Sequence, residues 1–196
     1  MPVMARTKQF DRHAVLDGAM ALFWTRGYHA TSIQDLVDHL GVNRQSLYDT
    51  FGGKDELYRA ALERYRDRQA LPLRRALMRD GPVRDVLRES FGLLISELLN
   101  NDGRGCLMTN TATELAAQNE AMFRLCSANA REQEALFAGL LARAQAAGEI
   151  GADRPVIPLA RFLVSTVNGL SVTAKATRDR KMLEDVVEVA LSALGP

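Results

Sequence analysis

Four polar side chains are spaced so that together they could read a DNA sequence. Arg44, Gln45, Tyr48 and Asp49 fall on one face of a helix of 3.6 residues per turn. Arginine can bond guanine bidentately, and glutamine can do the same with adenine. The Tyr48 hydroxyl, about one turn further on, could meet a phosphate. The spacing predicts that a helix over residues 44–50 enters a major groove with its N-terminal end leading.

The residues before this helix predict the elements that would position it. Thr31 or Ser32 is expected to cap the first of two helices, and Asp35 three residues after Ser32 is typical of a capping box. Gly41 suits a tight turn, and Asn43 is a good N-cap for the next helix. Apolar residues recur where two short helices must pack, at Ile33, Leu36, Val37, Leu40, Val42, Leu47 and Phe51. Residues 31–51 are therefore predicted to form a helix-turn-helix.

Phosphate contacts would position such a helix without reading sequence. Thr31 and Ser32, at a helix N-terminus, could bind one phosphate through hydroxyls and backbone amides. Lys54 and its amide, at the start of the next helix, could hold another. Ser46 is a further candidate. The predicted DNA-binding set is therefore Thr31, Ser32, Arg44, Gln45, Ser46, Tyr48 and Lys54.

The charge of the chain limits how it could attract DNA. The net charge is +1 over 196 residues, and residues 1–54 hold six basic and five acidic side chains. Any DNA footprint must therefore be local rather than a general positive field. Arg6 and Lys8 could reach along the backbone or into the minor groove. Asp49 leaves two interpretations open, because a carboxylate is repelled by phosphate: it accepts from a cytosine amino group, or it points away.

Composition and cysteine content favour an ordinary globular protein. Apolar residues make up 47% of the chain and charged residues 25%, and the length allows one or two domains. The two cysteines, Cys106 and Cys126, fit a reducing compartment and have no metal-ligand spacing. No signal-peptide run and no membrane-length apolar stretch is recognisable. We expect a cytoplasmic protein without metal or cofactor.

The remaining sequence reads as helices joined by short loops. Helical spacing predicts helices over residues 11–26, 106–117, 119–147, 155–177 and 181–194, with two more beginning at Lys54 and Gly81, and Pro72 marking a break or kink. No β alternation is found. The expected fold is all-α, with a DNA-binding domain over 1–54 and a second helical domain over 55–196.

The motifs of the first part closely resemble the DNA-binding domain of TetR-family transcriptional repressors. The resemblance covers about residues 10–60 and rests on Phe23, Gly27, Thr31, Ile33–Leu40, Gly41-Val42, Leu47-Tyr48, Phe51, Lys54 and Leu57. The segment Gly105–Leu115 also looks like one branch of that family, whereas Asp49 and Thr50 depart from its usual residues. The resemblance implies a homodimer that binds a palindromic operator in double-stranded DNA and is released by a small-molecule inducer.

The resemblance also implies a pocket among the middle helices. Soft and polar groups in an otherwise apolar region are usual in small-ligand sites. The candidates are Phe91, Ile95, Cys106, Met108, Thr109, Met122, Phe123, Cys126, Phe137, Phe162 and Thr166, although a buried apolar side chain is more often plain core.

The last two helices offer more apolar surface than one protomer need bury. Paired with their mates they could form a four-helix bundle. The residues expected to take part are Phe162, Val164, Val167, Leu170, Val172, Val186, Val187, Ala190 and Leu194.

Two other interpretations compete with ligand control. In the first, the chain is a redox-sensing repressor in which Cys106 or Cys126 is oxidised to a sulfenic acid or a disulfide. In the second, the chain is an all-α enzyme and its helix-turn-helix is incidental. The sequence offers no nucleophile–base pair, metal-ligand set or phosphate loop for such an enzyme.

Overall fold

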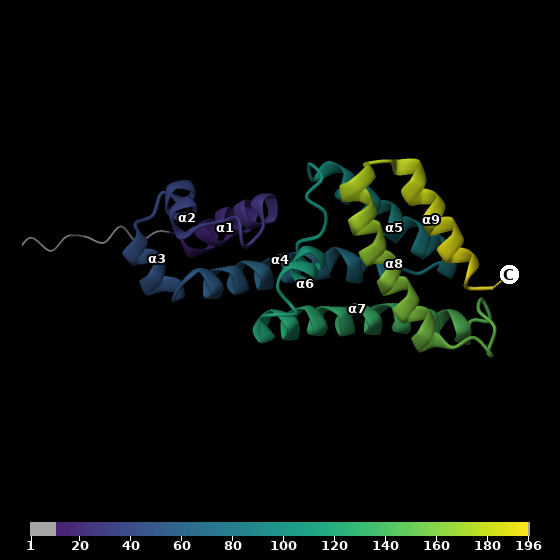
Figure 1. Ribbon diagram of the computed structural model, residues 1–196. Helices are drawn as coiled ribbons and strands as arrows, with labels where there is room; N and C mark the ends of the chain where they lie inside the picture. The colour runs from purple at the N-terminus through teal and green to yellow at the C-terminus, as the bar shows by residue number, and fades with distance from the viewer. Residues whose placement is uncertain (1–10, 196) are drawn as a thin grey trace, which may run out of the picture. The chain divides into compact units, whose positions relative to one another are not determined.

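The computed structural model describes residues 11–195, which form nine helices and no strand (Figure 1). In chain order the helices are α1 (Arg12–Arg26), α2 (Ile33–Leu40), α3 (Arg44–Phe51), α4 (Lys54–Leu77), α5 (Val83–Asn100), α6 (Leu107–Glu114), α7 (Glu120–Ala146), α8 (Val156–Thr177) and α9 (Arg180–Ser192). The predicted all-α class is confirmed. The predicted ends differ by a few residues, most of all at α6, which stops at Glu114 rather than at residue 117.

The first compact unit of the chain extends to Tyr65 and so includes the first half of α4. Phe23 of α1 meets Tyr58 of α4 edge to face, with ring centroids 4.8 Å apart. Asp17 accepts two hydrogen bonds from the Arg64 guanidinium, at 2.5 and 3.0 Å. Along the chain, the boundary between the compact units falls within α4, whereas the expected domain boundary was at the start of this helix.

Helix α4 continues through Pro72 to Leu77 instead of ending at the proline. Proline removes one backbone donor and crowds the carbonyl four residues earlier. Pro72 lies on the exposed side of α4, as does Arg68 one turn before it. Water can therefore satisfy the freed carbonyl, and the expected break does not occur.

The second compact unit begins at Arg66 and is built on α5, α7, α8 and α9. Helix α7 packs along α8, and α9 packs against both α5 and α8, while the short α6 rests on α7 (Figure 1). Their buried faces share one apolar core. It includes Leu87, Phe91, Ile95, Phe137, Leu141, Leu163, Leu170 and Leu183.

Helix α8 is, within residues 11–195, the one helix long and apolar enough to cross a membrane by length and composition. Arg161 and Lys175 interrupt the apolar run of this helix. Leu163 and Leu170 are buried in the protein interior, and α8 packs on four other helices. Helix α8 therefore packs one side into the apolar core of its unit.

Candidate nucleic-acid interface

Helix α3 is held at both ends by the signals expected from its sequence. The Asn43 side chain accepts a hydrogen bond from the Ser46 amide at 2.7 Å, which caps the N-terminus. Gly52 ends the helix with φ +93°, a left-handed conformation in which a β-carbon would be strained. Leu47 and Phe51 are buried, so the opposite face of α3 is turned to solvent.

The outward face of α3 carries the four side chains singled out in the sequence. Arg44, Gln45, Tyr48 and Asp49 are all exposed. The Arg44 guanidinium lies 6.0 Å from the centroid of the Tyr48 ring, and Gln45 Nε2 donates to Asp49 Oδ1 at 2.7 Å. Such a face combines hydrogen-bond donors and acceptors on a helix narrow enough for a major groove.

Tyr48 lies against the turn between α3 and α4, and Lys54 begins the helix after that turn. A β-carbon added at Gly53 would lie 3.8 Å from Tyr48 Cε1, which shows that the ring lies against this turn. The Lys54 ammonium sits 4.0 Å from the centroid of the Tyr28 ring. The Tyr48 phenol thus lies beside the turn that leads into α4, and the phenol, the Lys54 ammonium and the amides that begin α4 are all groups that can bind phosphate.

Tyr28 is a residue of this cluster that sequence reasoning did not select. Its hydroxyl donates to the Asp55 carboxylate. Burial and this hydrogen bond raise the pKa of Tyr28 well above its ordinary value, so the phenol stays neutral beneath Lys54. Tyr28 is far from Lys54 and Asp55 in the sequence and approaches them only in the folded unit. No local sequence pattern could therefore have revealed its role.

Ser32 begins α2 as the predicted capping box. Its hydroxyl accepts from the Asp35 amide at 3.1 Å, and Asp35 Oδ2 accepts from the Ser32 amide at 2.8 Å. The hydrogen bonds from Ser32, together with Arg26 at 2.8 Å, lower the pKa of Asp35. The hydroxyl and the amide of Ser32 are thus both used in the cap. A phosphate at this helix N-terminus would instead accept hydrogen bonds from the backbone amides that follow Ser32.

Thr31 does not lie where the sequence placed it. It is fully buried, and its hydroxyl donates to the Gly27 carbonyl at 2.7 Å. A residue without exposed surface cannot touch a phosphate, so the predicted contact is wrong for this conformation. Thr31 instead ties the end of α1 to the start of α2. Ser46 is half-buried, and Arg6 and Lys8 lie outside the described residues.

The predicted pocket residues fall into three groups. Five are buried in the interior, namely Phe91, Ile95, Met108, Met122 and Phe137, with the Phe91 and Phe137 rings stacked at 6.2 Å. Four are polar or sulfur-bearing: Cys106 just before α6, Thr109 of α6 and Cys126 of α7 are half-buried, and Thr166 of α8 is buried, with its hydroxyl donating to the Phe162 carbonyl. The other two, Phe123 and Phe162, are about half exposed.

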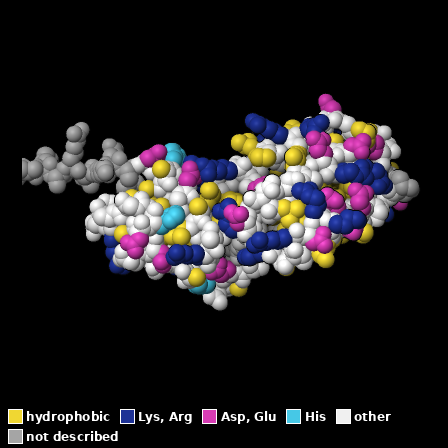
Figure 2. All heavy atoms as spheres, turned by 90° about the horizontal axis from the view of Figure 1, so that it is seen from above, with side chains coloured by type: hydrophobic (Ala, Val, Ile, Leu, Met, Phe, Trp, Pro, Cys, Tyr) yellow, Lys and Arg dark blue, Asp and Glu magenta, His cyan; other side chains and the backbone are white. Residues whose placement is uncertain are grey.

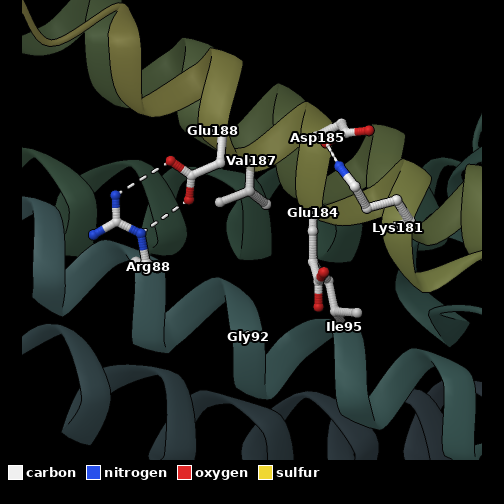
Figure 3. Close-up of a pocket in the computed structure, with 8 residues that line it drawn as sticks. All are labelled: Arg88, Gly92, Ile95, Lys181, Glu184, Asp185, Val187 and Glu188. Carbon is white, nitrogen blue, oxygen red and sulfur yellow. Dashed lines mark hydrogen bonds and ion pairs between the residues drawn. The ribbon is translucent and has the colours of Figure 1, made fainter.

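A groove of about 350 Å³ lies elsewhere, between α5 and α9 (Figure 3). Of the predicted pocket residues only Ile95 lines it. Arg88 bonds Glu188 across the groove, and Lys181 bonds Asp185 along α9. The charged groups at the rim of this groove are already paired with one another, and the groove lies apart from ten of the eleven predicted pocket residues.

Surface charges on the second unit are paired in the same way. On the face shown in Figure 2, basic and acidic side chains lie side by side over this unit. Arg161 bonds Glu134 at 3.0 Å and Arg88 bonds Glu188 at 2.9 Å. This mixture agrees with a DNA footprint confined to a local surface.

Family models match both parts of the chain. Residues 15–61 match the model described as "Bacterial regulatory proteins, tetR family". Residues 97–190 match a model described as "Tetracyclin repressor-like, C-terminal domain". The first match spans the whole helix-turn-helix, and the second begins near the end of α5 and reaches into α9.

Relatives and solved structures agree with these matches over nearly the full length. An uncharacterized regulator of Bacillus subtilis, YezE, is 35% identical over 97% of this chain and 100% of its own length. The repressor ComR of Escherichia coli is 35% identical over 96% of this chain and 90% of its own. A solved structure of a cysteine mutant of the TetR-family regulator CifR, in complex with 26-base-pair operator DNA, matches with a TM-score of 0.87 and 32% sequence identity. The match covers 97% of this chain and 100% of the CifR chain.

A helix-turn-helix with an exposed reading face, a second helical unit and full-length relatives thus agree. They confirm the predicted class and leave no place for the enzyme interpretation. The chain belongs to the TetR family and is a DNA-binding transcriptional regulator.

Proposed function

We propose that this regulator is a homodimeric repressor that binds a palindromic operator and is released by a small-molecule inducer. The observation that carries the proposal is the α3 face, on which Arg44 and Gln45 are exposed at the N-terminal end of a capped helix. The name of ComR as a repressor supports the direction of control.

Each residue of the interface then has a distinct task. Arg44 and Gln45 contact base edges, whereas Tyr48 and Lys54 hold phosphates on either side of the α3–α4 turn. Ser32 and Ser46 contribute at helix N-termini, where backbone amides face an anion. Thr31 supports α2 from inside and makes no DNA contact.

A reporter gene placed behind the operator tests the direction of control. Expression of the protein should lower the reporter signal, and Arg44→Glu should restore it because the base contact is lost. A reporter that rises with the wild-type protein would identify an activator and overturn the repressor assignment. Compounds that restore the signal with the wild-type protein are then candidate inducers, provided that they also release the operator from the purified protein.

The dimer is proposed to form through an apolar stripe along α8 and α9. Phe162 and Val172 of α8 and Met182, Val186 and Val189 of α9 are exposed, and Val189 retains 70% of its surface. A β-carbon at Gly169 would meet nothing within 4 Å, so a second backbone could approach there. A second copy of the chain would bury this stripe in a two-fold interface.

Six of the residues expected at this interface lie elsewhere. Val164, Val167, Leu170, Val187, Ala190 and Leu194 are buried within the protomer. Helix α8 packs on α5, α6, α7 and α9, and α9 packs on α5 and α8, so each helix uses one side for the core of its own protomer. The sequence showed that α8 and α9 are apolar but not which side each residue takes.

Lys54→Ala should weaken binding to every DNA sequence alike. If one phosphate contact is lost in each half-site, the slope of log affinity against log salt should fall by about 2 for a dimer. Titration of an operator duplex and a random duplex at several salt concentrations measures both effects. Lys181→Ala, which removes the same charge from α9, should leave the slope unchanged. An unchanged slope for Lys54→Ala would remove Lys54 from the interface.

Redox control through the two cysteines is the second candidate for how this regulator is released from DNA. Cys126 lies near Cys106, and its Sγ contacts the Met108 carbonyl at 3.8 Å. Burial, with a smaller contribution from Cys106, raises the pKa of Cys126 to about 11. Because the thiolate is the reactive form, a raised pKa makes Cys126 a poor sensor and favours ligand control.

Cys126 is expected to react slowly in the folded protein. In a Cys106→Ser variant at pH 8, alkylation of Cys126 should be about 100-fold slower than in the unfolded chain, since the thiolate fraction falls tenfold per unit of pKa. Equal rates in the folded and unfolded variant would contradict this. If Cys106→Ser and Cys126→Ser both leave release of operator by peroxide unchanged, redox control is excluded.

A further inference from the structure

Asp49 is an unusual residue for the face that meets DNA. Its carboxylate is exposed on α3 beside Gln45, on the side opposite the buried Leu47 and Phe51. Within residues 11–195 it makes no ion pair with a cation, and its hydrogen bond comes from the neutral Gln45 amide at 2.7 Å. A full negative charge therefore stands where the phosphates of an operator would approach.

Such a charge is tolerated in a major groove only where a base offers a donor. The donors there are the amino groups of cytosine and adenine, whereas guanine and thymine present acceptors that would repel a carboxylate. Adenine also carries the N7 acceptor beside its amino group, which makes cytosine the better partner. The Gln45 bond occupies Asp49 Oδ1 and leaves Oδ2 able to accept from the base.

We propose that Asp49 determines specificity by accepting from a cytosine amino group, with Gln45 fixing the orientation of its carboxylate. The bond also orients Gln45, because the amide nitrogen must face Asp49 and the amide oxygen is turned to the other side. Gln45 and Asp49 then act as one reading unit that favours amino-bearing bases, while Arg44 reads an acceptor such as guanine. This inference rests on the proposed function, in which α3 reads the operator.

The chain contains a matched control for this pair. Gln34 Nε2 donates to Asp38 Oδ1 at 2.8 Å, with the same residue types at the same spacing on exposed positions of α2. Helix α2 precedes the reading helix and is not proposed to touch base edges. Asp38→Asn therefore changes the same charge and the same kind of hydrogen bond without changing the reading face.

Selection of bound sequences from a random duplex pool, carried out with wild-type protein, Asp49→Asn, Asp49→Ala and Asp38→Asn, tests the proposal. The wild-type motif should contain a cytosine in each half-site whose preference is lost with Asp49→Ala and moves to another base with Asp49→Asn. Replacing that cytosine by thymine should weaken wild-type binding about 5- to 150-fold, and binding by Asp49→Ala much less. Asp38→Asn should select the wild-type motif.

The possible outcomes distinguish failure of this inference from failure of the proposed function on which it rests. A palindromic motif that both Asp49 variants share with the wild type would overturn the role of Asp49 and leave the regulator assignment intact. A motif that changes equally with Asp38→Asn would also overturn it, because the effect would then be one of general charge. Failure of the wild-type protein to enrich any sequence would instead count against operator reading by α3 itself. Thermal unfolding of each variant shows that the comparison is made between folded proteins.

Discussion

Replacing Arg44 by glutamate is expected to lower operator affinity at least about 100-fold. One bidentate contact to guanine contributes roughly 1–3 kcal/mol of discrimination, and a dimer would lose it in both half-sites. The new carboxylate would in addition face base acceptors and phosphates. The fold should survive, because Arg44 is exposed and α3 is held by its caps and by buried Leu47.

Operator binding by Arg44→Glu is measured by gel shift or by anisotropy of a labelled duplex. Arg59→Glu is the matched control, since Arg59 is exposed in the same unit and pairs only along α4 with Glu63 at 2.9 Å. It makes the same change of charge away from α3. If both variants lose affinity to the same degree, the effect is one of overall charge and Arg44 does not read bases.

Val189→Glu is expected to break the dimer and, with it, tight operator binding. Val189 is the most exposed large apolar side chain in the described part of the chain, and a two-fold interface would bring two buried carboxylates into it. A monomer carries only one α3 and cannot bind two half-sites at once. It therefore loses the gain in affinity from binding two linked half-sites, which is about 100- to 10,000-fold. The variant should bind a full palindrome no better than a single half-site.

Sedimentation velocity gives the oligomeric state, and titration with full and half-site duplexes gives the affinity. Leu93→Glu is the control, because Leu93 is also an exposed apolar residue but lies on α5 outside the α8–α9 stripe. A Val189→Glu protein that remains a dimer with unchanged operator affinity would place the interface elsewhere. The same result for Leu93→Glu and Val189→Glu would show only that added charge disturbs the unit.

The first unit could be predicted closely from sequence because its signals are local. The capping box of Ser32 and Asp35, the Asn43 cap and the glycine at residue 41 each act within a few residues, and the structure has all of them. Thr31 was wrongly predicted to contact phosphate because it directly precedes the exposed cap Ser32 in the sequence, although its own side chain is buried. That difference depends on how the end of α1 folds back, which no local pattern records.

The second unit could be predicted as helices but not as a site. Apolar residues of α8 and α9 recur on more than one side, so spacing alone did not separate the core side, with Leu170, from the exposed side, with Val172. The predicted pocket residues differ in burial for a related reason. Phe123 and Phe137 are chemically alike, and only the packing of α7 decides that one is half exposed and the other buried.

The central claim is that α3 of a dimer reads a palindromic operator. Selection of bound sequences from a random duplex pool by the purified wild-type protein, followed by binding at several salt concentrations, tests it most directly. An enriched palindrome with two equivalent half-sites is the predicted result. Weak binding that depends only on salt, with no sequence enriched, would contradict it.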